Sequence, residues 1–201
     1  MKKTVYALVA MVVIVTIYSL INSSDDTPLA YVEGIKKERK EKDEFMSKSA
    51  ESPFRVFGDT TVKLNYYPID PNFKLMAKVD YLEKTQYVTL ASSDGSPVKY
   101  RKYAYAHFKL NGEKYKLLIL QDPDAKQGGL FTAFADETSA IDTYGAGRYL
   151  DLDFRRANRI VLDFNKAYNP YCMYNSSFSC PFPPKDNVLS TSIKAGEKTY
   201  P

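Results

Sequence analysis

The chain has 201 residues, of which 44% are hydrophobic and 26% are charged, an ordinary composition for a globular protein. Seventeen Tyr and eleven Phe stand against no Trp, and aromatic residues favour strands. The formal net charge of +4 is spread along the chain without a dense basic block. Nucleic-acid binding usually needs clustered Lys and Arg, so the sequence predicts no nucleic-acid partner.

The N-terminus determines the predicted compartment. Met1-Lys2-Lys3 is followed by eighteen uncharged residues, Thr4 to Ile21, which as a helix would be about 27 Å long, close to the thickness of a bilayer's hydrocarbon core. The lysines before this segment and Asp25-Asp26 after it place the N-terminus in the cytoplasm by the positive-inside bias. We therefore expect a transmembrane anchor over residues 1–22, contact with the lipid bilayer through residues 4–21, and a domain on the periplasmic side.

A cleaved signal peptide is the alternative, and it would give a secreted protein. Such a peptide usually has a shorter apolar region that ends in small residues of the Ala-x-Ala kind. Here the apolar region ends in Ser-Leu-Ile-Asn-Ser at residues 19–23. Both interpretations place the domain outside the cytoplasm.

Residues 23–51 are predicted to form a charged helical linker next to the membrane. Thr27-Pro28 is typical of a helix start, with Thr27 as the cap and Pro28 at the first helical position. Six basic and six acidic residues lie between Glu33 and Glu51, several of them four apart with opposite sign. A stalk or a docking helix would have this pattern, and so would a helix with a solvated surface, which is the interpretation we favour.

The remaining residues, 52–201, are predicted to form a mainly β (α+β) domain, an antiparallel β-barrel or a sandwich-like fold. Segments rich in aromatic and β-branched residues are expected as strands; they are Val62–Tyr67, Phe73–Leu82, Gln86–Ala91, Leu130–Phe134 and Arg159–Phe164. The clearest element is a hairpin, in which Tyr103–Leu110 and Glu113–Leu120 flank Asn111-Gly112, a type I′ turn signal.

A two-residue turn determines which residues of the hairpin face each other. The pairs on one face are Leu110 with Glu113, Phe108 with Tyr115, Ala106 with Leu117 and Ala104 with Ile119, and this mostly apolar face should be buried. The opposite face carries Tyr103, Tyr105, His107 and Lys109 across from Leu120, Leu118, Lys116 and Lys114, in that order. This second face is more polar, and we expect it to be the wetter one.

His107 is the only histidine, and Cys172 and Cys180 are the only cysteines. Lys116 beside His107 disfavours a charged imidazole, so we expect a partly exposed strand residue rather than a catalytic base. An even number of cysteines in an oxidising compartment favours a disulfide, which would stabilise the Pro-rich loop by about 2.5 kcal/mol. The alternatives are free thiols or a metal site, but a metal needs more soft ligands than one distant His provides.

The most unusual local sequence runs from Asp136 to Leu150. Gly145 and Gly147, spaced by one residue, permit backbone conformations that turn N–H groups towards an anion. Arg148 follows at once and can bind a carboxylate or phosphate through two hydrogen bonds. The alternative is a glycine turn in which Arg148 pairs with a nearby Asp.

This part of the chain resembles a known family. The residues that carry the resemblance are Phe134-x-Asp136, Thr143–Leu150, Leu162–Pro170, Cys172, Tyr174-Asn175, Cys180-Pro181 and Ala195-Gly196-Glu197. Together they resemble the bacterial domain-of-unknown-function family 1684, over roughly Ser52 to Lys198. Thr132-Ala133 and Ala140 depart from the family pattern, where a small apolar residue followed by Pro, and a Gly, are expected. The resemblance brings no established activity; it suggests a distant similarity to the flavin-binding split barrels, which are rich in β-structure.

The resemblance also implies that the signature residues form one cluster, made of Tyr144, Gly145, Gly147, Arg148, Asn165, Tyr168, Asn169, Cys172 and Cys180. Polar residues in a family signature more often belong to a binding or catalytic site than to a surface without a function. We therefore expect Arg148 to face a ligand.

Two functions are compatible with these observations. The first is a non-catalytic extracytoplasmic module, without a cofactor, that binds a small anionic ligand or an envelope protein. Arg148 would supply the charge, the Gly145 and Gly147 backbone the donors, and Tyr144 and Tyr168 the walls.

The second function is an enzyme, either an FMN-dependent oxidoreductase of split-barrel type or a hydrolase. Asp136, Asp142 and Arg148 would then be the acid–base and anion-stabilising groups. The sequence lacks a Walker loop, a dinucleotide fingerprint, a nucleophile elbow and a zinc-protease motif, which weakens the enzyme hypothesis.

Overall fold

The computed structural model describes Met11 and residues 27–58, 61–122, 129–154 and 156–200. The chain divides into two compact units, Met1–Glu41 and Lys42–Pro201. Within the part of the chain that the structure describes, no helix is long and apolar enough to cross a membrane. The predicted span, Thr4–Ile21, lies outside the described residues except for Met11, so the anchor stays a prediction.

Helix α2 (Pro28–Lys48) begins in the first unit and ends in the second. Thr27 caps it as predicted, because the Thr27 Oγ1 accepts a hydrogen bond from the Ala30 N–H at 3.1 Å. In the second unit, Met46 is 1% exposed and packs into an apolar cluster with Phe54, Val62, Leu64 and Tyr174. The last turns of α2 therefore belong to the second compact unit, which begins at Lys42. The domain boundary at Ser52 stays a prediction.

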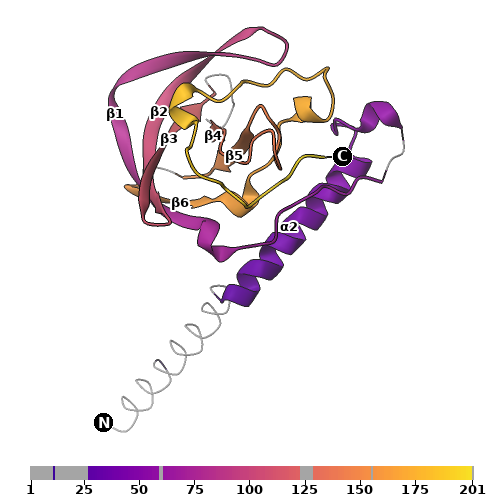
Figure 1. Ribbon diagram of the computed structural model, residues 1–201, viewed down its shortest axis with the longest axis horizontal. Helices are drawn as coiled ribbons and strands as arrows, with labels where there is room; N and C mark the ends of the chain where they lie inside the picture. The colour runs from indigo at the N-terminus through magenta and orange to yellow at the C-terminus, as the bar shows by residue number, and fades with distance from the viewer. Residues whose placement is uncertain (1–10, 12–26, 59–60, 123–128, 155, 201) are drawn as a thin grey trace. The chain divides into compact units, whose positions relative to one another are not determined.

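The body of the domain is mainly β, as predicted, and its described strands form one antiparallel sheet that curls into a half-barrel (Figure 1). The strands are β1 (Lys74–Ala91), β2 (Pro97–Leu110), β3 (Glu113–Gln121), β4 (Leu130–Phe134), β5 (Arg148–Leu152) and β6 (Arg159–Asp163). Their order across the sheet is β5-β4-β3-β2-β1-β6. Short 3-10 helices precede the sheet at Arg55–Phe57 and Pro71–Phe73.

The described chain after β6 contains no further strand of the sheet. It forms the 3-10 helices Phe164–Lys166, Tyr171–Met173 and Lys185–Asn187, joined by loops that run across the curled sheet (Figure 1). A continuous ladder of backbone hydrogen bonds is missing along most of this C-terminal segment. Isolated backbone hydrogen bonds, such as the Leu189 N–H to the Ala135 carbonyl at 2.8 Å, and side chains therefore hold it in place.

The strands of the structure differ from the predicted strands in three places. Phe73–Leu82 and Gln86–Ala91 belong to one strand, β1, because pairing with β2 continues across an irregularity between the two segments. The strand predicted at Val62–Tyr67 is wrong, since these residues form a single bridge, from Tyr66 to Glu197. Strand β5 was not predicted, because its residues follow directly on the glycines of the signature.

The hairpin prediction is largely confirmed. Asn111 and Gly112 have φ angles of 52° and 87°, as a type I′ turn requires, and all four pairs of the apolar face are observed. A bulge between Lys102 and Ala104 shifts the register further along, so Leu120 pairs with Lys102 and not with Tyr103.

The interior face of the hairpin is buried as expected, within a core formed by residues such as Ala104, Ala106, Phe108, Leu117 and Ile119. The prediction for the opposite face is wrong at Leu118 and Leu120, which are both 0% exposed and pack with Leu90 and Tyr100. The C-terminal segment covers this part of the sheet. His107, further along, is partly exposed beside Lys116 as expected, with its Nε2 3.3 Å from Asp80 Oδ2.

Candidate functional site

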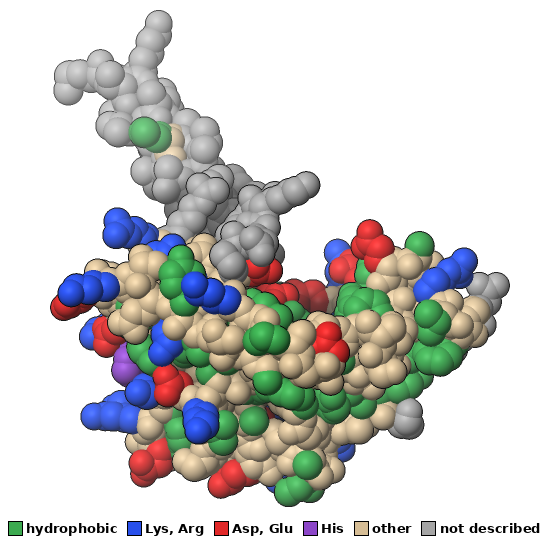
Figure 2. All heavy atoms as spheres, turned by 90° about the horizontal axis from the view of Figure 1, so that it is seen from above, with side chains coloured by type: hydrophobic (Ala, Val, Ile, Leu, Met, Phe, Trp, Pro, Cys, Tyr) green, Lys and Arg blue, Asp and Glu red, His purple; other side chains and the backbone are tan. Residues whose placement is uncertain are grey.

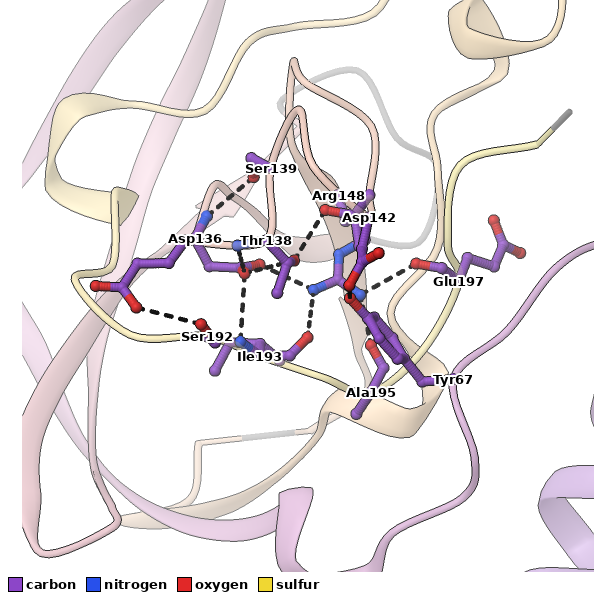
Figure 3. A network of polar contacts seen from close by, with 12 residues as sticks. Tyr67, Asp136, Thr138, Ser139, Asp142, Arg148, Ser192, Ile193, Ala195 and Glu197 are labelled. Atoms are coloured by element: carbon purple, nitrogen blue, oxygen red, sulfur yellow. Dashed lines mark hydrogen bonds and ion pairs between the residues drawn. The ribbon is translucent and has the colours of Figure 1, made fainter.

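Arg148 lies at the start of β5 and is 1% exposed. Its Nη2 donates to Asp136 Oδ2 and to the carbonyl of Ile193, both at 2.8 Å. Its Nη1 donates to the carbonyl of Glu197 at 3.1 Å and to that of Ala195 (Figure 3). The alternative of a glycine turn with Arg148 paired to an Asp is thus what the structure shows. A ligand could reach these two nitrogens only by displacing protein groups.

Asp136 is equally occupied by protein donors. Its Oδ1 accepts hydrogen bonds from the N–H of Thr138 at 2.8 Å and from the Thr138 hydroxyl at 2.6 Å. The N–H of Ile193 lies 3.3 Å from the same oxygen. An acid–base group has to reach a substrate proton, and the side chain of Asp136 is only 1% exposed. Asp136 and Arg148 together therefore anchor residues 193–197 to the sheet.

Asp142 lies nearer the surface. Its Oδ2 accepts a hydrogen bond from the Tyr67 hydroxyl at 3.0 Å, and its Oδ1 is 3.8 Å from Lys198 Nζ. Burial, together with the hydrogen bond to Asp142, raises the pKa of Tyr67 to about 12. Asp142 thus holds Tyr67 and lies beside Lys198, two residues from opposite ends of the domain.

The two signature glycines lie in closely packed positions. Gly147 has a φ of 88°, and a Cβ there would lie 2.5 Å from the carbonyl oxygen of Phe134 and 2.7 Å from Pro183 Cγ. Its N–H donates to the Tyr144 carbonyl at 3.0 Å. A Cβ on Gly145 would lie 3.3 Å from the Cβ of Ala140. Only glycine at 147 lets β5 and the C-terminal segment approach this closely.

The signature asparagines also bind backbone groups. Asn165 receives the N–H of Asp70 on its Oδ1 at 2.9 Å and donates to the carbonyl of Asp70 at 2.8 Å. The side chain of Asn169 donates to the carbonyl of Lys198 at 2.9 Å. Both residues are at most 2% exposed. Asn165 therefore fixes the chain before β1, and Asn169 fixes the C-terminal residues.

Glu197, part of the signature, is a buried carboxylate with its own set of partners. Its Oε2 accepts hydrogen bonds from the N–H of Asn169 at 2.8 Å and from the Tyr174 hydroxyl at 2.7 Å. Its Oε1 lies 2.6 Å from Nζ of Lys42 in helix α2. The same ammonium lies 4.5 Å from the centre of the Tyr168 ring, and the Tyr168 hydroxyl donates to Asp151 at 2.8 Å. Arg148 and Asn169 are thus both joined to Glu197, and Lys42 links Glu197 to Tyr168. That these signature residues face a ligand stays a prediction.

Asn187 is a further buried polar residue that sequence reasoning missed. Its Oδ1 accepts the N–H of Leu118 at 2.6 Å, and its Nδ2 donates to the carbonyls of Leu118 at 2.9 Å and Ala133 at 2.8 Å. The direct pairs between β3 and β4 are Leu120–Phe131 and Gln121–Leu130, so the amide takes the place of the next rung of the ladder. The sequence carried no pattern around it that indicated this role.

Cys172 and Cys180 are free thiols in this structure, and the disulfide between them stays a prediction. They nevertheless lie together, and the N–H of Cys172 donates to Cys180 Sγ at 3.2 Å. Interactions with Cys180, Ser93 and Tyr144 lower the pKa of the Cys172 thiol to about 6, while the interaction with Cys172 and burial raise the pKa of Cys180. Among the described residues, no group of three or more His, Cys, Asp or Glu is placed to hold a metal ion.

A groove of about 420 Å³ lies between the sheet and the C-terminal segment. Its lining consists of Val88–Ala91 of β1, Lys102 of β2, Leu118 of β3, and Phe182–Asp186. We call residues 182–186 the groove wall. None of the sequence-predicted site residues lines this groove directly, although Gly147 lies behind the wall at Pro183.

Comparisons with known proteins agree with the resemblance seen in the sequence. The model of the family described as protein of unknown function (DUF1684) matches residues 56–198. The solution NMR structure of an uncharacterized protein from Haloarcula marismortui is 35% identical, with a TM-score of 0.67, and the match covers 87% of this chain and 97% of that chain. No curated protein matches the chain. The chain therefore belongs to the DUF1684 family of proteins of unknown function.

Proposed function

We propose that this protein is a non-catalytic binding domain that holds a small amphipathic anion in the groove between the sheet and the groove wall. The observation that carries the proposal is an apolar floor beside two lysines, Lys102 and Lys185, that form no ion pair with any described residue. A volume of about 420 Å³ lies within the range of small-molecule sites, which are mostly apolar with a few polar groups.

The floor supplies the apolar part of the site. Leu90 and Leu118 belong to a buried cluster on this face of the sheet, and Pro183 and Pro184 approach from the other side. An alkyl or aromatic group of a ligand would cover apolar surface that the groove still exposes, as at Phe182, at about 25 cal/mol per Å² of apolar area.

The charges of the groove favour an anion. Lys102 is partly buried and Lys185 is exposed at the rim, whereas the nearby carboxylate of Asp186 already accepts the Tyr105 hydroxyl at 2.7 Å. On the face of the molecule shown in Figure 2, basic and acidic side chains are interspersed. A small ligand would therefore be recognised by these local lysines and not by a broad field of one sign.

The groove wall is held at several points, so the site is preformed. The Tyr149 hydroxyl donates to the carbonyl of Pro181 at 2.6 Å, and the N–H of Phe182 donates to the carbonyl of Ala91 at 2.8 Å. Gly147 packs against Pro183, and Asn187 joins the wall to β3 and β4. A site that is already ordered loses little conformational entropy on binding.

Decanoate, an alkyl chain with one carboxylate, is a suitable probe for calorimetric titration. Binding should weaken by about tenfold, or about 1.4 kcal/mol, in the double variant Lys102→Met with Lys185→Met. The matched control is Lys109→Met, an exposed lysine on β2 that does not line the groove. Decanol, which has no charge, should bind the wild type more weakly than decanoate does. It should bind the double variant as tightly as it binds the wild type. Equal decanoate affinity in the double variant and the control would remove the groove from consideration.

We further propose that residues 4–21 tether this domain to the outer side of a membrane. Support comes from the uncharged run of eighteen residues that follows two lysines. The test is carbonate extraction combined with protease treatment of intact spheroplasts. A tethered protein stays in the membrane pellet and loses its domain to the protease. Release of the full-length chain by carbonate, or protection of the domain, contradicts the tether.

A further inference from the structure

The two cysteines occupy a shared position at the edge of the domain. Cys172 belongs to the 3-10 helix Tyr171–Met173, and its N–H donates to Cys180 Sγ at 3.2 Å. The backbones of Ser93 and Cys180 are joined by the Ser93 N–H to the Cys180 carbonyl at 2.9 Å, and the Cys180 N–H donates to Ser93 Oγ at 3.2 Å. The loop between the two cysteines is therefore fixed with both thiols at the same place.

The two thiols differ in accessibility. Cys172 is partly exposed, whereas Cys180 is 8% exposed and packs in an apolar cluster with Ala133 and Tyr149. In thiol–disulfide exchange, one thiol has to meet the substrate and the other has to be close to the first but protected. The arrangement of Cys172 and Cys180 meets both conditions.

The surroundings of Cys172 favour its reactive form. Interactions with the Cys180 thiol and with the side chains of Ser93 and Tyr144 lower the pKa of Cys172 to about 6. The thiolate is the nucleophile in disulfide exchange. Burial and the hydrogen bond to Cys172 instead keep Cys180 protonated by raising its pKa.

We propose that Cys172 and Cys180 form a thiol–disulfide exchange site, in which Cys172 attacks an accessible disulfide of a peptide or small molecule and Cys180 resolves the intermediate. The Cys172 thiolate forms a bond to one substrate sulfur, and the other substrate sulfur leaves as a thiolate. Cys180 then gives up its proton, bonds to the Cys172 sulfur and displaces the second substrate sulfur, which leaves with that proton. The cysteine pair is oxidised by two electrons, and the substrate disulfide is reduced.

Oxidised glutathione is the probe, added to the reduced full chain, and intact-protein mass spectrometry follows the products. The wild type should lose two hydrogens without accumulating an adduct. Cys180→Ala should accumulate one glutathione on Cys172. Cys172→Ala should react at Cys180 at least about tenfold more slowly, because the remaining thiol is buried.

Tyr144→Phe in the Cys180→Ala background tests the positioning of the Cys172 thiolate. Loss of the Tyr144 hydroxyl should slow adduct formation at neutral pH. At a pH above the pKa of a free cysteine thiol, the rate of adduct formation should not change. Circular dichroism shows whether each variant is folded. Equal reactivity of the two single cysteine variants overturns the proposal, as does a native wild-type disulfide that neither dithiothreitol nor glutathione can open. These results are independent of decanoate binding, so the exchange site and the groove can fail separately.

Discussion

Replacing Arg148 with Met tests whether this residue anchors the fold. Methionine keeps most of the apolar volume and removes every hydrogen bond of the guanidinium. The carboxylate of Asp136, 1% exposed, would be left without its cation. The carbonyls of Ile193, Ala195 and Glu197 would each lose a donor.

The expected loss of stability is large. Removing one partner of a buried ion pair costs about 3–5 kcal/mol, because the remaining charge is uncompensated. A domain of this size is stable by about 5–15 kcal/mol in total, so the variant would approach the unfolding threshold. At about 2–4 °C per kcal/mol, its melting temperature should fall by at least 6 °C. Adding Asp136→Asn removes the unpaired charge and should restore part of the loss.

Urea unfolding measures the effect, with far-UV circular dichroism as the signal because the chain has no Trp. The matched control is Arg159→Met, an exposed arginine at the start of β6, which should change the free energy of unfolding by less than about 0.5 kcal/mol. If Arg148→Met unfolds at the same urea concentration as the wild type, the anchoring role is refuted and the ligand-facing prediction regains support.

Three further changes have expected outcomes. Ala140 has a φ of 65°, and Ala140→Gly should raise the urea midpoint by relieving about 1 kcal/mol of left-handed strain, partly offset by glycine's entropy; an unchanged or lower midpoint contradicts this. Asn187→Leu leaves the N–H of Leu118 unpaired and should cost about 1–3 kcal/mol, with faster hydrogen exchange of that amide as the specific readout. Burial raises the pKa values of Tyr67 and Tyr105 to about 12 from 10.0. Since the folded state then holds more protons, stability should fall as pH rises from 10 towards 12, and less steeply in Tyr105→Phe.

The hairpin could be predicted because its information is local. Asn111-Gly112 demands a tight turn, and alternation along two adjacent segments then determines the facing pairs. Burial of Leu118 and Leu120 could not be predicted in the same way. The residues that cover them lie about 65 positions further along the chain, in a Pro-rich stretch with no strand or helix period.

The signature illustrates a different limit of sequence reasoning. Arg148, Asn165 and Asn169 have the residue types that bind small ligands, and the sequence predicted a ligand for them. In the structure their partners are mainly backbone groups of Ile193, Asp70 and Lys198. Every residue carries such groups, so no pattern of side chains reveals which segment supplies them.

The abundance of buried polar residues follows from the shape of the fold. A C-terminal segment without strands cannot satisfy its backbone groups by a ladder, and an unsatisfied buried group costs about 1–3 kcal/mol. Asn187, Arg148 and Glu197 meet this need at backbone groups of Ala133 in the sheet and of Ile193 and Asn169 in the C-terminal segment. The groove wall lies between the first of these anchors and the cysteine pair, so the residues that stabilise the fold also keep the groove open. Under the proposed function, a ligand would be recognised by the residues that line the groove, next to the signature.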